Sequence, residues 1–125
     1  GTVIHPRAII SKRCKIADGT VVMAGATVNS ETVIGRHCII NTNASIDHDC
    51  RLADFVHVSP NVSLAGNVTV GEGTHIGIGS TVIQGIQIGK WATIGAGSVI
   101  IKDVPDYAVV VGVPGSIIKF ITPTT

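Results

Sequence analysis

A histidine flanked by two aspartates, Asp47-His48-Asp49, is the part of this sequence best suited to chemistry. Imidazole changes its charge near neutral pH, so it can take a proton from a reacting group and return it. Either aspartate could orient the ring and stabilise the imidazolium. Asn41, a few residues earlier on the same stretch, adds an amide that can bind a polar ligand. The stretch therefore indicates a general-base site.

A six-residue repeat is the element that must position this site. From Ile4 to Ile100 every sixth residue is aliphatic, including Ile46 just before the histidine. The residue four places further on is small or β-branched throughout, and all three cysteines fall in this class. Such an unbroken period identifies a repeat architecture in which two residues per hexad face inward. We therefore expect a β-solenoid in which the cysteines are small core residues and no histidine points into the core.

Glycine often follows the repeated aliphatic residue, as at Gly35, Gly71, Gly77, Gly89 and Gly95. Glycine at this place suits a corner where the chain turns sharply or needs a positive φ. The repeat stops near Val104-Pro105, and the apolar segment that follows predicts a cap over the open end. We therefore assign residues 1–105 to the solenoid and residues 106–125 to a C-terminal cap and tail.

Composition excludes several classes of partner. The 125 residues carry 9 basic and 8 acidic side chains, which argues against a nucleic-acid or membrane-surface partner because both need a basic field. No apolar run is long enough to cross a bilayer, and no export leader is visible. Three cysteines without metal-type spacing predict neither a disulfide framework nor a metal site, and they fit a reducing cytoplasm.

The hexads Ile34-Gly35-Arg36-His37-Cys38-Ile39 and Ile94-Gly95-Ala96-Gly97-Ser98-Val99 resemble those of the hexapeptide-repeat acyltransferases. The resemblance implies an all-β fold, a left-handed parallel β-helix with three hexads in each triangular coil. Residues 18 apart in sequence then stack on neighbouring coils, which places Gly66 against His48. The resemblance also implies a homotrimer with active sites between subunits, and a mean hydropathy of +0.48 agrees with buried outer faces.

Ser45-Ile46-Asp47-His48-Asp49-Cys50 and Leu64-Ala65-Gly66-Asn67 are similar to one subgroup, the bacterial sugar acetyltransferases of the NeuD/PglD type. By that resemblance His48 is the general base, Asp49 polarises it, and the Gly66 N–H meets the thioester carbonyl of acetyl-CoA. The subgroup implies N-acetylation of a nucleotide-linked amino sugar or, alternatively, O-acetylation of sialic acid or a related sugar.

The same resemblance predicts the residues that bind the two substrates. Asn41, Asp47 and His57 would bind the sugar or nucleotide-sugar. The acetyl-CoA groove would contain Gly66, Gly77, Gly95, Ala96 and Lys102. Subgroup members usually carry an N-terminal βαβ domain that helps to bind the sugar nucleotide, and this sequence starts where their solenoid begins. The identity of the sugar is therefore left open.

A zinc enzyme is the more distant alternative. His57 and His75 are 18 apart and should stack on one face, as a metal pair would. The carbonic-anhydrase branch of the fold uses a His pair five apart plus a third histidine, and no H-x-x-x-x-H occurs here. No metal is therefore expected.

Overall fold

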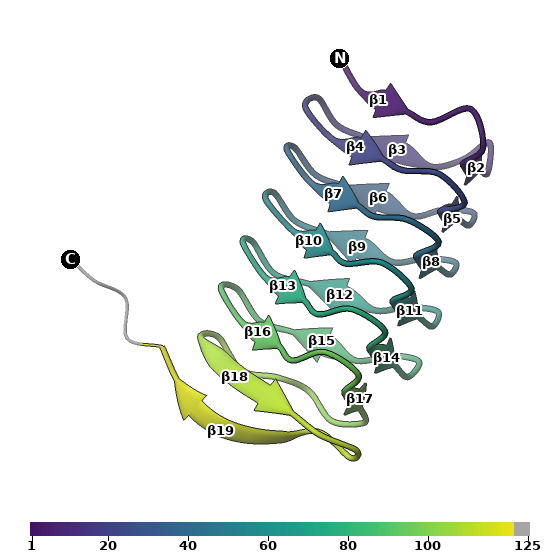
Figure 1. The fold of residues 1–125 in the computed structure, drawn as a ribbon. Helices are drawn as coiled ribbons and strands as arrows, with labels where there is room; N and C mark the ends of the chain where they lie inside the picture. The colour runs from purple at the N-terminus through teal and green to yellow at the C-terminus, as the bar shows by residue number, and fades with distance from the viewer. Residues whose placement is uncertain (122–125) are drawn as a thin grey trace.

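The structure is a computed structural model that describes residues 1–121. These residues form a prism of three β-sheets whose strands run parallel, except for β19 at the C-terminal end (Figure 1). The coil runs from one sheet to the next in a left-handed sense, and no helix occurs among the described residues. The predicted left-handed parallel β-helix of hexapeptide repeats is confirmed. No helix in this part of the chain is long and apolar enough to cross a membrane.

Each of the first 17 strands is two residues long. The first sheet contains β1 (Val3–Ile4), β4 (Val21–Val22), β7 (Ile39–Ile40), β10 (His57–Val58), β13 (His75–Ile76), β16 (Thr93–Ile94), β18 (Ala108–Val111) and β19 (Ser116–Phe120). The second contains β2 (Ile9–Ile10), β5 (Thr27–Val28), β8 (Ser45–Ile46), β11 (Ser63–Leu64), β14 (Thr81–Val82) and β17 (Val99–Ile100). The third contains β3 (Lys15–Ile16), β6 (Val33–Ile34), β9 (Arg51–Leu52), β12 (Thr69–Val70) and β15 (Gln87–Ile88).

Three corners join the sheets and carry most of the polar side chains. The first corner leads from the first sheet to the second. The second corner leads from the second sheet to the third, and the third corner returns from the third sheet to the first. Strands pair with the strand 18 residues away, as His57 does with His75. Each corner therefore presents a column of residues one coil apart, at a spacing of about 4.8 Å.

The core consists of the repeated aliphatic residues and the small residues four places later. Ile34, Ile46 and Ile94 are at most 1% exposed, and Cys38 and Cys50 are fully buried. Ile4 is the most exposed of the repeated aliphatic residues at 42%, and Ile10 and Ile16 of the same coil are half-buried. This coil is the first one, so among the described residues it has a neighbouring coil on one side only. The inward pattern therefore follows the sequence wherever a coil has neighbours on both sides.

The corner glycines are required by close approach and not by a positive φ. A Cβ at Gly71 would lie 2.4 Å from the backbone nitrogen of Lys90 on the next coil. The left-handed conformation occurs two residues later in the hexad, at Gly73 (φ 71°) and, without glycine, at Asp49 (φ 58°). The positive φ that the sequence offered as one reason is therefore wrong for these glycines, and the structure adds the close approach of the next coil.

An antiparallel hairpin of β18 and β19 ends the described chain. β18 joins the first sheet in parallel with β16, but Ile94 pairs with Val110, only 16 residues away. The last coil is therefore two residues shorter than the others. The division at residue 105 stays a prediction, and residues 122–125 of the predicted tail lie outside the described residues.

Candidate functional site

His48 lies on the second corner, in a turn that is hydrogen bonded to the coils on both sides. The Asp49 N–H donates to the Ser30 carbonyl at 3.0 Å on the preceding coil. On the following coil, the Leu64 carbonyl accepts from the Asp47 N–H and the Asn67 N–H donates to the His48 carbonyl, both at 3.0 Å. These bonds continue the sheet pattern through the corner, so the backbone that carries His48 is held in place.

The His48 ring is fixed by its neighbour and by the glycine one coil away. Nδ1 lies 2.9 Å from Asp49 Oδ2, and both side chains are 50% exposed. A Cβ built on Gly66 would be 2.6 Å from His48 Nε2 and 2.6 Å from Cε1. The ring therefore occupies the space that a side chain at residue 66 would take. With Nδ1 donating to Asp49, Nε2 is left as the acceptor that a general base requires.

Asp47 contributes to the same turn through one carboxylate oxygen. Its Oδ1 accepts the His48 N–H at 2.7 Å and the Asn29 side-chain amide at 3.2 Å. Asp47 is half-buried, so this carboxylate supports the turn whatever else it binds. The prediction that Asp47 contacts the substrate therefore applies to its other oxygen.

Gly66 supplies a backbone donor beside His48. Within residues 1–121 its N–H has no hydrogen-bond acceptor, whereas the N–H at the same hexad position of Arg36 donates to Asp54 Oδ1 at 2.8 Å. An N–H without a partner next to an imidazole nitrogen is the arrangement that can stabilise an oxyanion.

Cys50 follows Asp49 but points into the core, where its thiol donates to the Ala65 carbonyl at 3.3 Å. Burial raises the pKa of this thiol, and the charges of Asp47 and Asp49 raise it further. Because the thiolate is the nucleophile, Cys50 is not suited to form an acyl-enzyme.

His57 and His75 lie side by side on the outer face of the first sheet. Their ring centroids are 4.6 Å apart with an interplanar angle of 62°, and Ser59 Oγ lies 3.2 Å from His75 Nε2. His57 is not a core residue, but its Nε2 is enclosed without a hydrogen-bond partner in the described chain. Burial, with the charge of His75, lowers the pKa of His57. Among residues 1–121, no three His, Cys, Asp or Glu side chains are grouped to hold a metal ion.

The predicted site residues fall into two separate groups within one chain. Asp47, His48, Asp49, Gly66 and Lys102 belong to the second corner, where Lys102 is in the same column as His48 and Gly66. Asn41, Gly77, Gly95 and Ala96 belong to the first corner, and His57 lies on the adjoining outer face of the first sheet. The structure therefore brings each group together but does not bring the two groups to each other.

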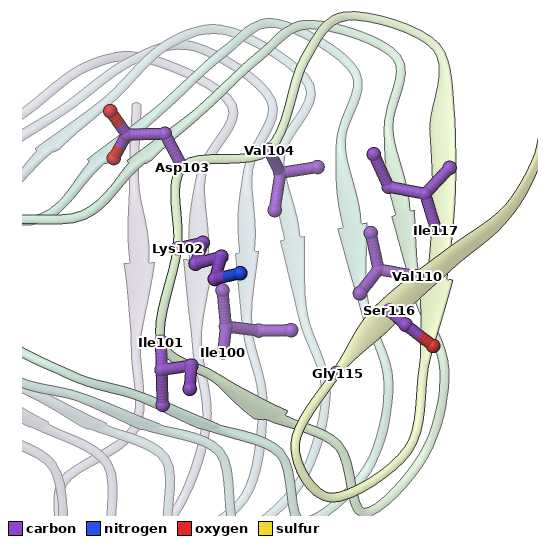
Figure 2. Close-up of a pocket in the computed structure, with 9 residues that line it drawn as sticks. All are labelled: Ile100, Ile101, Lys102, Asp103, Val104, Val110, Gly115, Ser116 and Ile117. Carbon is purple, nitrogen blue, oxygen red and sulfur yellow. The ribbon is translucent and has the colours of Figure 1, made fainter.

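A pocket of about 260 Å³ lies at the C-terminal end of the second corner (Figure 2). Residues 100–104 form one wall, and Val110, Gly115, Ser116 and Ile117 of the hairpin form the other. Lys102 points its ammonium group toward this space. The hairpin residues were missed by sequence reasoning because they lie outside the repeat and have no register to place them.

Asn29 was also missed, although the repeat carries a signal for it. It is one coil of 18 residues before Asp47, so the stacking that placed Gly66 beside His48 places Asn29 beside Asp47.

Comparison with known proteins shows which proteins the repeat resembles. The family model described as bacterial transferase hexapeptide (six repeats) matches residues 67–102. Over these residues the chain is similar to that family. The resemblance identified from the sequence is confirmed, because related solved structures are sugar acetyltransferases with the same solenoid. No curated protein matches the sequence.

Three solved structures illustrate the similarity. A His-to-Asn mutant of perosamine N-acetyltransferase from Caulobacter crescentus, in complex with CoA and GDP-perosamine, is 43% identical over 93% of this chain and 55% of its own, with a TM-score of 0.92. The acetyltransferase domain of PglB from Neisseria gonorrhoeae, in complex with acetyl coenzyme A, is 43% identical over 94% of this chain and 57% of its own, with a TM-score of 0.93. WeeI from Acinetobacter baumannii is 28% identical over 90% and 56%, with a TM-score of 0.87. This chain therefore spans little more than half the length of these relatives.

Proposed function

We propose that this protein is an acetyl-CoA-dependent sugar acetyltransferase that N-acetylates a nucleotide-linked amino sugar in the cytoplasm. The observation that carries the proposal is the His48 ring, bound at Nδ1 by Asp49 and lying with Nε2 over Gly66. The similarity to relatives that hold CoA and GDP-perosamine supports the choice of both substrates.

The proposed reaction is a direct transfer in which the residues of the second corner handle one proton. His48 Nε2 takes a proton from the sugar amine as its nitrogen bonds to the thioester carbon. The Gly66 N–H stabilises the negative charge that develops on the carbonyl oxygen. Asp49 keeps the proton on Nδ1 and stabilises the imidazolium. As the carbon–sulfur bond breaks, His48 returns the proton to the departing sulfur, so CoA leaves as a thiol and the base is regenerated.

The second corner also offers a route for the acetyl-CoA chain. His48, Gly66, Gln84 and Lys102 succeed one another one coil apart, so the base and the lysine are separated by about 14 Å along the corner. This separation lets an extended pantetheine chain place its thioester at His48 and its phosphates near a cation. The pocket beside Lys102 continues the route at its far end.

The two groups of predicted site residues support a trimer with shared sites. In a ring of three, each subunit meets its neighbours through two different surfaces. Here the second corner of one copy would face the first sheet and first corner of the next, joining His48 to Asn41 and His57. The first sheet has apolar residues for such an interface: Ile39 is 39% exposed, and Ile118 and Phe120 on β19 are each 57% exposed. Exposed apolar residues on this scale indicate a covered surface.

The activity can be tested by following CoA release from acetyl-CoA with nucleotide-linked 4-amino sugars, the matching hydroxyl sugars and sialic acids. We expect release with an amino sugar and a loss of at least about a hundredfold in His48→Ala. Release with a hydroxyl sugar or sialic acid alone would instead support O-acetylation. No release with any sugar, or an unaffected His48→Ala, would contradict the proposal.

The shared site can be tested by mixing two inactive variants. His48→Ala lacks the base on the second corner, and His57→Ala lacks the imidazole on the first sheet. In trimers assembled randomly from both, about a quarter of the interfaces would combine the two intact surfaces and recover activity. Mixed trimers without activity would show that the first sheet does not complete the site.

A further inference from the structure

We propose that Asn29 is a positioning residue for His48, acting through the Asp47 carboxylate. This inference rests on the proposed function, because it concerns the same base. The contact that carries it is the hydrogen bond of 3.2 Å from Asn29 Nδ2 to Asp47 Oδ1, the oxygen that also accepts the His48 N–H at 2.7 Å. One oxygen thus joins the preceding coil to the backbone of the base.

Asn29 can perform this role because its own backbone is fixed to the His48 coil. Its N–H donates to the Ile46 carbonyl at 2.9 Å, and its carbonyl accepts the Cys14 thiol at 2.8 Å. The side chain therefore approaches Asp47 from a rigid strand end. Asparagine suits the place because an amide donates to a carboxylate without adding a charge beside His48.

The hydrogen bond from Asn29 to Asp47 supports the part of the turn that has the fewest other restraints, the His48 N–H. The residue after His48 is fixed by the hydrogen bond from the Asp49 N–H to the Ser30 carbonyl, and the His48 carbonyl is fixed by the hydrogen bond from the Asn67 N–H. The His48 N–H has Asp47 Oδ1 as its acceptor. If Asn29 no longer oriented that carboxylate, Asp47 could rotate and release the N–H, so the backbone of the base would lose one of its restraints.

Removal of the amide is the first test. In Asn29→Ala we expect kcat to fall about three- to tenfold, the size expected for one typical intramolecular hydrogen bond, with KM for acetyl-CoA unchanged. Ser11→Ala is the matched control, since Ser11 occupies the same hexad position one coil further from the site. It should leave kcat unchanged. Thermal unfolding of both variants separates a loss of fold from a loss of positioning.

Replacement of the Asn29 amide by a carboxyl group should change the pH dependence of activity, which a purely structural role of Asn29 would not do. In Asn29→Asp two carboxyl groups would face each other across the 3.2 Å contact and could not both ionise easily, so one pKa would rise. While that proton is bound, the pair keeps a hydrogen bond and His48 stays in place. The activity of Asn29→Asp relative to wild type should therefore decline as pH rises through that pKa.

The charged and titratable groups around Asp47 are common to both proteins, so they cancel in this ratio. They are His48 and Asp49 in the same turn, Cys50 behind it and Glu31 on the preceding coil, while residues 65–67 of the following coil do not titrate. Parallel pH profiles for wild type and Asn29→Asp, or an unchanged kcat in Asn29→Ala, would overturn the inference. If one of these results is found and His48→Ala is inactive, the proposed function still stands. If His48→Ala is active, both the proposed function and the role of Asn29 are contradicted.

Discussion

Gly66→Ala should lower the activity strongly while leaving the fold intact. The new Cβ would lie 2.6 Å from His48 Nε2, against 3.4–4 Å for an ordinary van der Waals contact. The ring must therefore move by about 1 Å, since the backbone on both coils is held by hydrogen bonds. A displacement of about 1 Å at a reacting group can cost about a hundredfold in rate. We expect kcat to fall by about this factor.

The stability of Gly66→Ala should change little, for two reasons in the structure. Gly66 does not have a positive φ, so alanine adopts its backbone conformation without strain. The atoms that the methyl group meets belong to the half-exposed His48 ring, which can swing toward solvent. We expect the free energy of unfolding to change by less than about 1 kcal/mol.

Gly19→Ala is the control with the opposite expectation. Gly19 has a φ of +79° on the third corner, and the atoms nearest to its Cβ would belong to the exposed His37 ring. The left-handed conformation should cost the variant about 1–2 kcal/mol of stability, with activity unchanged. The rate of acetyl-CoA turnover measures the activity of the two variants, and denaturant unfolding measures their stability. Gly66→Ala with wild-type turnover would show that the observed ring position is not the reactive one.

Three further predictions concern other parts of the structure. A thiol reagent should modify native Cys14 but not the fully buried Cys38 and Cys50, and rapid labelling of all three would contradict the packing. Because its thiol points into the core, Cys50→Ala should keep its activity. Because the pKa of His57 is lowered from 6.5, the unfolded chain binds more protons than the folded one just below that pH. Folding stability should therefore fall on acidification through this window, and urea unfolding of His57→Gln should show a shallower dependence. Lys102→Ala should raise KM for acetyl-CoA several-fold with little change in kcat, and the effect should disappear with acetyl-pantetheine, which has no phosphates.

The repeat predicted a β-solenoid, and the family resemblance supplied the three hexads per coil that place Gly66 beside His48. Once neighbouring coils are 18 residues apart, the partner of any corner residue follows from counting, which placed Gly66 against His48. The orientation of Cys50 followed from the same register, since it shares the buried position of Cys38. The counting works because parallel pairing with an unchanged offset leaves no freedom in the stacking.

Other features depended on geometry that the period does not contain. Aliphatic-Gly pairs suggested either a sharp turn or a positive φ, and only coordinates could show that the close approach of the next coil requires glycine at Gly71. The pocket at the C-terminal end depends on a last coil two residues shorter, which the broken repeat indicates but does not place. The 18-residue offset already places Asn29 next to Asp47. An asparagine has many structural uses, however, so only the structure could show its hydrogen bond to Asp47.

The regularity that places His48 also keeps Asn41 and His57 away from it within one chain. A solenoid arranges its corner residues in columns, and residues on different corners stay apart however the sequence changes within the register. His48 and Lys102 share a column, whereas Asn41 follows a strand of the first sheet, on another corner. Only a second surface laid against the second corner can supply Asn41 or His57 to the base. If the function is as proposed, assembly is a condition of catalysis, and a variant held as a monomer should bind acetyl-CoA weakly and transfer no acetyl group.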